Sequence, residues 1–102
     1  MDDIRVPVPP GSTRFLDLLR VDMRARGYAL PTERTYLLWI TRYIHFNKRR
    51  HPAEMGQPEI ESFLNHLAVD RTVSPATQRT ALNALMYLYT KYFGREPPQL
   101  TF

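Results

Sequence analysis

The chain has 102 residues, a length that suits one globular domain and leaves little room for a second. It contains no cysteine, which excludes a disulfide framework and a thiolate metal site, and no apolar run approaches the roughly 20 residues of a membrane span. The formal net charge of +4 and the isoelectric point near 9.8 permit an anionic partner. We therefore expect a soluble, cytoplasmic protein that has no membrane partner.

Positive charge is unevenly distributed along the chain. The excess of basic over acidic residues is largest in residues 31–51 and rises again in residues 74–102, whereas residues 52–73 are acidic overall. Such a pattern is usually a set of solvated helix faces, but it also suits a polyanion. The distribution makes nucleic acid a candidate partner and leaves the solvated alternative open.

The chain begins with residues 1–12, whose three prolines and one glycine predict a flexible arm. Ser12 or Thr13 is a suitable N-cap for a first helix over residues 14–26, and Gly27 ends that helix. The apolar side of this helix consists of Phe15, Leu16, Leu19 and Met23.

A second helix is predicted over residues 31–48, with an aromatic inner face and a basic outer face. The inward residues are Tyr36, Trp39, Ile40, Tyr43 and Ile44, with Leu37 and Phe46 at the margins. The opposite face carries Arg34, Leu38, Thr41, Arg42, His45 and Arg49, with Thr35 beside them. This helix is expected to supply the aromatic part of the core.

A third helix is predicted over residues 58–70, because Pro58 suits a first helical turn and apolar residues recur at helical spacing. Its inward residues are Ile60, Phe63, Leu64, Leu67 and Ala68. Glu59 and Glu61 lie near its start, where the helix dipole favours negative charge.

A fourth helix is predicted over residues 75–93, with Ser74 as its N-cap and Gly94 after its end. One face is apolar and consists of Ala81, Leu82, Leu85, Leu88, Tyr89 and Tyr92. The opposite face consists of Ala76, Arg79, Thr80, Asn83 and Tyr87. The positions of glycine and proline agree with the apolar periodicity throughout the chain. We therefore expect an all-α, four-helix orthogonal or bundle-like domain over residues 13–94. A linker is expected over residues 95–102.

Catalytic and metal-binding patterns are missing from the sequence. His45, His51 and His66 show no partner at ligand spacing such as i, i+4, and the four scattered glycines form no phosphate-binding loop. Most tyrosines fall on apolar stripes and are expected in the core, which leaves Tyr28 and Tyr87 as candidates for exposure. We therefore predict no catalytic residue, no metal and no cofactor.

Nucleic acid and protein remain alternative partners on the residues alone. Ser74, Thr77 and Arg79 at a helix start form a candidate phosphate anchor, with Asn83 one turn further along to reach a base edge or another phosphate. For each of these residues, capping, packing or solvation is about as good an interpretation. A helical protein-interaction module would instead use the outward apolar residues, which are Leu38, Met86 and Tyr87.

The motifs, taken together, resemble a known family. They are the run Tyr28-x-Leu30-x-Thr32-Glu33-x-x-Tyr36-x-x-Trp39, then Phe46 and Arg50-His-Pro52, and finally Val73-Ser-x-x-Thr77-x-x-x-Ala81-Leu-x-Ala84-Leu-x-x-x-Tyr89. In order and spacing they are similar to the amino-terminal core-binding domain of tyrosine recombinases, above all to integron integrases. The likeness covers residues 15–100 and all four predicted helices.

The resemblance implies a four-helix SAM-like module that closes over one face of a duplex, while a separate carboxy-terminal catalytic domain closes over the other. It implies DNA contact through the outer faces of the second and fourth helices, with basic residues nearby contributing. The predicted DNA-binding residues are Thr32, Arg34, Thr35, Arg42, Lys48, Arg49, Ser74, Thr77, Arg79, Thr80, Asn83 and Lys91. The family's catalytic residues belong to the other domain, so this chain is expected to have no activity by itself. Pro31 departs from many relatives, which leaves a backbone contact at that turn in doubt.

The resulting hypothesis is a DNA-binding module of a site-specific recombinase that acts in DNA integration. Its expected partners are double-stranded or folded single-stranded DNA, the catalytic domain of the same parent chain, and other recombinase protomers on DNA. The domain alone is expected to be monomeric, bacterial and cytoplasmic, and associated with the nucleoid when bound. One alternative is a helix-turn-helix regulator that uses residues 71–73 as the turn, and the other is the protein-interaction module.

Overall fold

The computed structural model describes residues 7–98, which form an all-α domain. The four α-helices are α1 (Phe15–Ala25), α2 (Leu30–Phe46), α3 (Gln57–Val69) and α4 (Pro75–Met86). A short 3-10 helix, η1 (Pro52–Glu54), precedes α3, and a π-helix, η2 (Tyr87–Tyr92), continues α4. The described residues contain no strand, and the predicted all-α class is confirmed.

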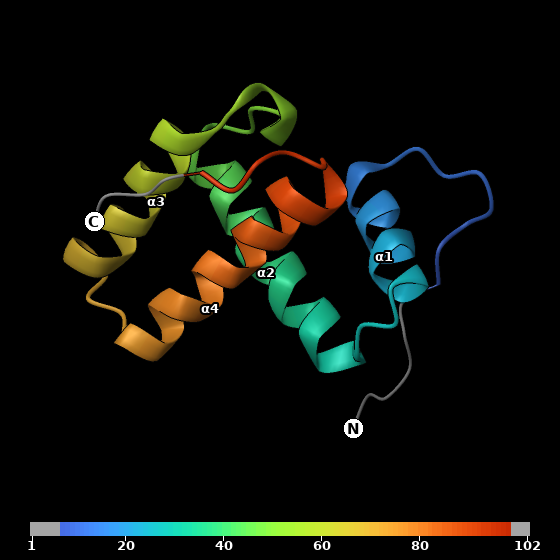
Figure 1. Ribbon diagram of the computed structural model, residues 1–102, viewed down its shortest axis with the longest axis horizontal. Coiled ribbons are helices and arrows are strands. Elements are labelled where there is room, and N and C mark those ends of the chain that lie inside the picture. Colours follow the sequence, from blue (N-terminus) through green and yellow to red (C-terminus); the bar gives the residue numbers. More distant parts are fainter. Residues whose placement is uncertain (1–6, 99–102) are drawn as a thin grey trace.

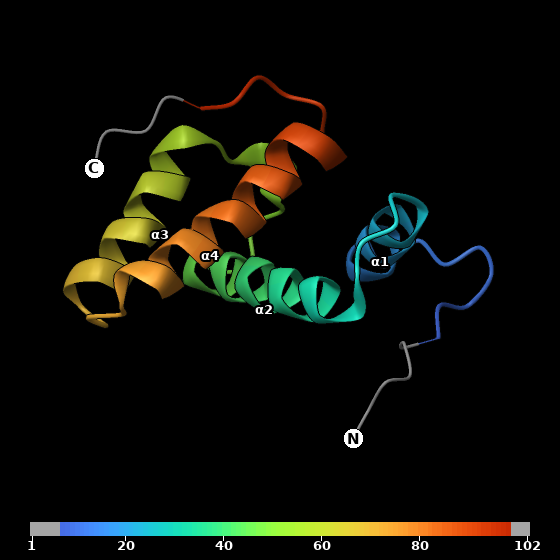
Figure 2. The same ribbon diagram turned by 60° about the horizontal axis from the view of Figure 1, so that its bottom comes forward.

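The helix pair α2 and α4 forms the centre of the domain. These two helices pack most extensively against each other and cross obliquely, with α3 beside one end of the pair and α1 beside the other (Figures 1 and 2). The N-terminal halves of α2 and α4 diverge from the crossing toward the same edge of the molecule (Figure 1). This arrangement places the starts of both helices on one side. Within residues 7–98, no helix is both long and apolar enough to cross a membrane.

Glycine and serine end and begin the helices as the sequence predicts. Gly27 follows α1 with φ of 79°, and the Tyr28 amide donates to the Met23 carbonyl at 3.0 Å, which closes the helix with a left-handed residue. Ser74 caps α4, because its hydroxyl oxygen accepts the Thr77 amide at 3.1 Å.

The start of α1 differs from the prediction. Arg14 is the N-cap and makes no side-chain cap hydrogen bond. Ser12 lies two residues before it and donates its hydroxyl to the Asp17 carboxylate at 2.7 Å. Asp17 also pairs with Arg20 at 3.1 Å and is buried. A short polar network therefore fixes the chain ahead of α1 in place of a conventional cap.

The end of α2 also differs, because the helix stops at Phe46 and not at Lys48. Lys48 and Arg49 adopt left-handed backbone angles, with φ of 58° and 63°. At the end of the helix, the Tyr43 carbonyl accepts both the Asn47 backbone amide at 3.2 Å and the Asn47 side-chain amide at 2.9 Å. Both basic residues therefore belong to a turn and not to a helix face.

The outward position predicted for Tyr87 is wrong. Tyr87 is 4% exposed and packs between the rings of Tyr28 and Tyr36, with centroids 5.5 and 5.7 Å away. Its hydroxyl donates to Asp22 on α1 at 2.7 Å. Tyr87 begins the π-helix, where the wider turn changes the direction of successive side chains, and Tyr87, Leu88 and Tyr89 are all buried. Tyr28 is half-buried.

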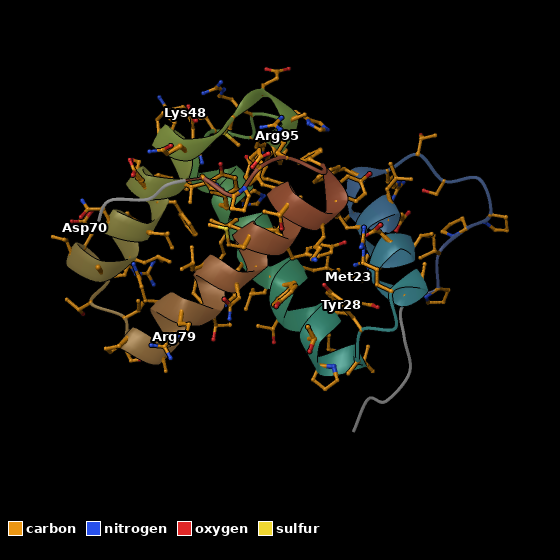
Figure 3. All side chains as sticks on the ribbon, viewed as in Figure 1. Met23, Tyr28, Lys48, Asp70, Arg79 and Arg95 are labelled. Carbon is orange, nitrogen blue, oxygen red and sulfur yellow. The ribbon has the colours of Figure 1, made fainter. Side chains whose placement is uncertain are left out.

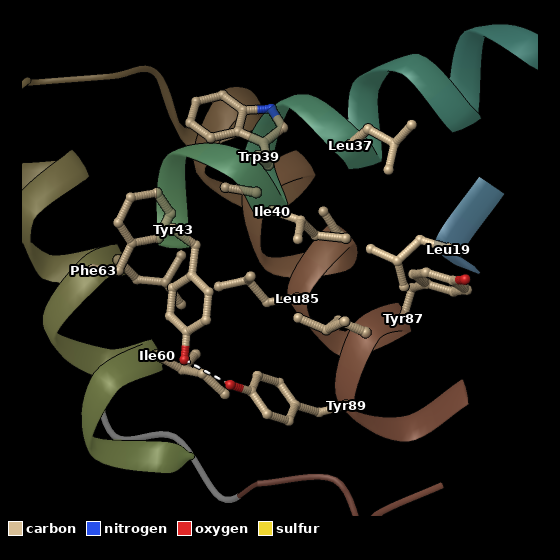
Figure 4. Packing of buried hydrophobic residues seen from close by; sticks show 14 of the residues in the cluster. Leu19, Leu37, Trp39, Ile40, Tyr43, Ile60, Phe63, Leu85, Tyr87 and Tyr89 are labelled. Carbon is tan, nitrogen blue, oxygen red and sulfur yellow. Dashed lines mark hydrogen bonds between the residues drawn. The ribbon is translucent and has the colours of Figure 1, made fainter. Parts of the chain in front are cut away.

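The core is one cluster contributed by all four helices, in which Ile40, Leu85 and Leu88 are fully buried. Figure 4 shows Ile40 of α2 and Leu85 of α4 within it. Most predicted inward residues lie in it or against it. Two assignments are wrong: Leu37 is buried and not marginal, while Ala68 is exposed on α3. Both residues lie at the border of an apolar stripe, where a small rotation of the helix decides burial.

Two buried tyrosine hydroxyls point toward each other within this core (Figure 4). The oxygens of Tyr43 and Tyr89 are 2.9 Å apart, and Tyr89 donates onward to the Pro52 carbonyl at 2.8 Å. Because Tyr89 uses its proton on Pro52, Tyr43 is the donor in the pair. Burial, together with this hydrogen bond, raises the pKa of Tyr43 well above its ordinary value.

The direction of these hydrogen bonds, from Tyr43 to Tyr89 and from Tyr89 to Pro52, predicts that removing the two hydroxyls has unequal effects on stability. Tyr89→Phe leaves both the Tyr43 hydroxyl and the Pro52 carbonyl without a partner and is expected to lower the free energy of unfolding by about 2 kcal/mol. Tyr43→Phe removes only one bond, and the expected loss is about 1 kcal/mol. Urea denaturation of both variants measures the difference, and equal losses, or a larger loss for Tyr43→Phe, would contradict the assigned direction.

Glu59 closes the N-terminus of α3. Its carboxylate accepts the Gly56 amide at 2.8 Å and pairs with Arg50 at 3.3 Å. The amide hydrogen bond is the main cause that lowers the pKa of Glu59 from its ordinary 4.5, with Arg50 adding to it. A carboxylate whose pKa is lowered by folding stabilises the protein above its unfolded pKa, and that contribution is lost as the pH falls through the folded value.

Glu59→Gln is therefore expected to destabilise the domain near neutral pH but not in acid. The expected loss is below about 1 kcal/mol at pH 7, because the pair with Arg50 is near the surface. Thermal unfolding of both proteins from pH 7 to pH 2.5 should show the two curves converging once the pH falls below 4.5. A difference that stays constant over this range would show that Glu59 does not act through its charge.

Candidate nucleic-acid interface

A shallow hollow of about 240 Å³ lies between α2 and α4. It is lined by Pro31, Thr32, Thr35 and Tyr36 from α2, and by Thr80 from α4. Thr32, Thr35 and Thr80, which are three of the twelve residues predicted to bind DNA, therefore meet in one place although they come from helices far apart in the sequence. Hydroxyl groups beside a basic surface are typical contacts for phosphate oxygens.

The N-terminal half of α4 extends this surface. Arg79 and Asn83 are exposed, and Thr77 is half-buried beside the cap. Ser74 both accepts the Thr77 amide and donates to the Thr77 hydroxyl at 3.0 Å, so its hydroxyl is used in capping. Thr80 donates its hydroxyl to the Ala76 carbonyl at 3.0 Å and keeps oxygen lone pairs available. On this helix, Arg79 and Asn83 are the side chains that project most freely.

The outer face of α2 supplies two further arginines, Arg34 and Arg42, and both are exposed. The guanidinium of Arg42 lies 5.0 Å from the centre of the Trp39 ring, a contact that orients the side chain without neutralising its charge. Within residues 7–98, neither Arg42 nor Arg79 forms an ion pair with a carboxylate.

Other arginines, in contrast, are paired. Arg20, Arg24 and Arg26 on or next to α1 bind Asp17, Glu33 and Asp22, and Arg50 binds Glu59. This division matters because a paired cation must give up its carboxylate before it can neutralise a phosphate. The arginines of α1 are therefore engaged by carboxylates, whereas Arg42 on α2 and Arg79 on α4 keep their charge for an anionic partner.

The remaining predicted residues lie elsewhere. Lys48 and Arg49 belong to the turn after α2, and Figure 3 shows Lys48 and Arg79 at opposite edges of the domain. Lys91 belongs to η2, where its carbonyl accepts the Arg26 guanidinium at 2.8 Å, beside the end of α1. These three residues do not extend the surface formed by the hollow and the N-terminal half of α4.

The apolar residues that favoured a protein partner are mostly buried. Tyr87 is in the core, Met86 is half-buried, and only Leu38 is exposed, at 46%. A single exposed leucine is common on protein surfaces. The observation that supported a protein-interaction module is therefore largely removed.

The statement that no histidine has a partner at helical spacing is wrong for His66. Its Nδ1 lies 2.9 Å from the carboxylate of Asp70, four residues later on α3. The i, i+4 spacing of His66 and Asp70 is visible in the sequence and could have predicted this contact. The pair does not make a metal site, since the described part of the chain contains no cluster of three potential ligands.

Comparison with known proteins identifies the domain. The model of the family described as phage integrase, N-terminal SAM-like domain, matches residues 15–99. Two curated relatives, each named integrase/recombinase, come from Escherichia coli and Pseudomonas aeruginosa and are 42% identical to this chain over 101 residues. The alignment covers 98% of this chain and 30% of each relative, so the chain spans about a third of their length. The match confirms the SAM-like fold, and the chain belongs to the family of phage integrase N-terminal SAM-like domains.

Proposed function

We propose that this chain is the DNA-binding domain of a tyrosine site-specific recombinase and that it holds duplex DNA at recombination sites during DNA integration. The observation that carries the proposal is that Arg42 on α2 and Arg79 on α4 are exposed and form no ion pair within residues 7–98, while Thr32, Thr35 and Thr80 of the same two helices line one hollow. The catalytic groups would come from the part of the parent protein that lies outside this chain. The similarity to integron integrases in the motifs supports that class of recombinase as the parent.

The proposed contacts divide between phosphates and bases. Arg34, Arg42 and Arg79 suit phosphate oxygens, with Thr32 and Thr35 adding neutral hydrogen bonds. Asn83 has a side chain that can donate and accept at once, so it is the residue best suited to a base edge. Ser74 would act through the α4 N-terminus that it caps, where backbone amides and the helix dipole favour an anion. The domain would thus contact mainly the phosphate backbone of the DNA.

A titration with labelled duplex DNA at two salt concentrations tests this function. Because phosphate binding releases counterions, the affinity of the 102-residue chain should fall steeply as salt rises. Changing one phosphate-binding arginine to alanine should reduce the slope of log K against log salt by about 1. Absence of binding at low salt, or an affinity that does not respond to salt, would overturn the proposal. A helix-turn-helix regulator would instead require a dimer and a palindromic site.

A further inference from the structure

The chain turns back along the domain after η2. Gly94 has φ of 69°, a left-handed angle that glycine adopts without strain, and the Arg95 amide donates to the Tyr89 carbonyl at 2.8 Å. The segment that follows η2 runs toward the N-terminal end of α3 (Figures 1 and 2). The turn at Gly94 therefore brings Arg95 to the segment between α2 and α3, far away in the sequence.

The Arg95 side chain binds this turn to the segment before α3. Its two terminal nitrogens donate to the carbonyl oxygens of Ala53 and Met55, the latter at 2.8 Å. Ala53 lies in η1, and Met55 directly follows η1. Because a guanidinium donates in a rigid planar fork, two carbonyl acceptors fix the direction of the side chain as well as its distance.

Two aromatic rings of η2 and its end support the same guanidinium. Its central carbon lies 5.2 Å from the ring centre of Tyr89 and 5.2 Å from that of Phe93. Tyr89 is buried and its hydroxyl donates to the Pro52 carbonyl, while Phe93 stacks on Phe15 of α1 with centroids 6.2 Å apart. Such cation–π contacts add to the hydrogen bonds of the guanidinium. Arg95 therefore joins the end of the domain to η1 and η2 together.

The contacts of Arg95 determine the direction of the chain more than the stability of the domain. Arg95 is exposed, and a single exposed residue contributes little to global stability. Pro97 and Pro98 favour an extended backbone in the residues that follow. Because η2 continues α4, the exit of the chain is fixed relative to a helix that the proposed function places on DNA.

We propose that Arg95 is a positioning residue of the recombinase, which fixes the direction in which the chain passes from this domain to the rest of the parent protein. The chain matches 30% of the length of each relative, and its family consists of N-terminal domains. The inference rests on the proposed function in that both parts of the parent would hold the same duplex. A fixed exit raises the effective concentration of the second part at that duplex, since this concentration depends on the stiffness of the connection.

The distance between two spin labels tests this role in the whole chain. The sequence contains no cysteine, so labels attach only to the introduced pair Val21→Cys on α1 and Pro97→Cys, both at exposed positions. With Arg95 present, the distance distribution should be narrow. Arg95→Ala should widen it at least about twofold, because the released segment samples many conformations. Arg95→Lys should widen it nearly as much, since an ammonium group keeps the charge but lacks the planar fork.

Thermal unfolding and duplex binding separate positioning from folding. Both Arg95 variants should unfold within about 4 °C of the labelled chain with Arg95 intact. They should also bind duplex DNA within about twofold of it, because Arg95 lies outside the proposed DNA-binding surface. Arg79→Ala is the matched control, since it should weaken duplex binding and leave the distance distribution unchanged.

A wide distribution with Arg95 intact, or a distribution that neither substitution widens, would overturn the inference. A large loss of both thermal stability and duplex binding in Arg95→Lys would also overturn it, because Arg95 would then be needed for folding and not for positioning. Failure of the proposed function is a separate result, which is the absence of duplex binding by the unaltered chain.

Discussion

Replacing Glu33 with alanine is expected to lower the free energy of unfolding by about 3 kcal/mol, one of the largest effects available from a single polar residue of this domain. Glu33 is 1% exposed, and its two carboxylate oxygens each accept a hydrogen bond from Arg24 at 3.0 Å. The variant removes the carboxylate and leaves Arg24 partly buried and without its main partner. The same contact raises the pKa of Arg24, so the guanidinium cannot escape the cost by losing its proton.

Chemical denaturation measures this effect, with Glu96→Ala as a control for the loss of one negative charge at an exposed position. The control is expected to change the free energy of unfolding by less than about 0.5 kcal/mol. The double replacement Arg24→Met with Glu33→Leu should cost less than Glu33→Ala alone, because no buried charge is left unpaired. An unchanged unfolding midpoint in Glu33→Ala would show that the pair between α1 and α2 does not hold these helices together.

Reversing the charge of Arg42 and Arg79 together is expected to weaken duplex DNA binding by about a hundredfold at 0.1 M salt, at about tenfold for each phosphate contact turned into a repulsion. The two residues lie on different helices and do not pair with carboxylates in the described structure, so each should act nearly independently. Fluorescence anisotropy with a labelled duplex measures both single variants and the double variant.

Arg14→Glu is the control for this reversal, because it makes the same change in net charge at an exposed position at the start of α1. It is expected to weaken binding by no more than about threefold, through the general charge of the protein alone. If Arg14→Glu and Arg79→Glu weaken binding equally, then the DNA responds to net charge and not to a surface on α4.

Local features of the fold could be predicted from the sequence because they depend on neighbouring residues. Ser74 begins a helix through its cap, and Gly27 and Gly94 end helices through their backbone angles. Each of these effects reaches no further than one helical turn. The spacing of Leu85 and Tyr89 likewise predicted their burial. The burial of Tyr87 could not be predicted, because Tyr87 lies in a π-helix and contacts Asp22 and Tyr28, which are far away in the sequence.

Contacts between helices account for the parts of the site that the sequence did not reveal. Arg24 and Glu33 form a bidentate pair that joins α1 to α2, which the sequence did not reveal, whereas Arg42 and Arg79 have no carboxylate partner within residues 7–98. The hollow that joins Thr35 to Thr80 depends on how α2 crosses α4. Arg49 was expected on the outer face of the second helix but lies with Lys48 in a turn, because α2 ends at Phe46 and both residues have left-handed backbone angles. The assignment of particular residues to DNA remains a prediction.

Mapping the amide chemical shifts of the isotope-labelled chain during titration with duplex DNA tests the central claim most directly, because every backbone position reports at once. The account predicts that the largest shifts fall in residues 32–42 of α2 and 74–83 of α4, including Arg42, Arg79 and Asn83, and that they weaken together as salt rises. The exposed residues of α1 and α3 should shift little. Largest shifts on α1, or shifts spread evenly over the domain, would contradict the assignment of the DNA-binding surface to α2 and α4.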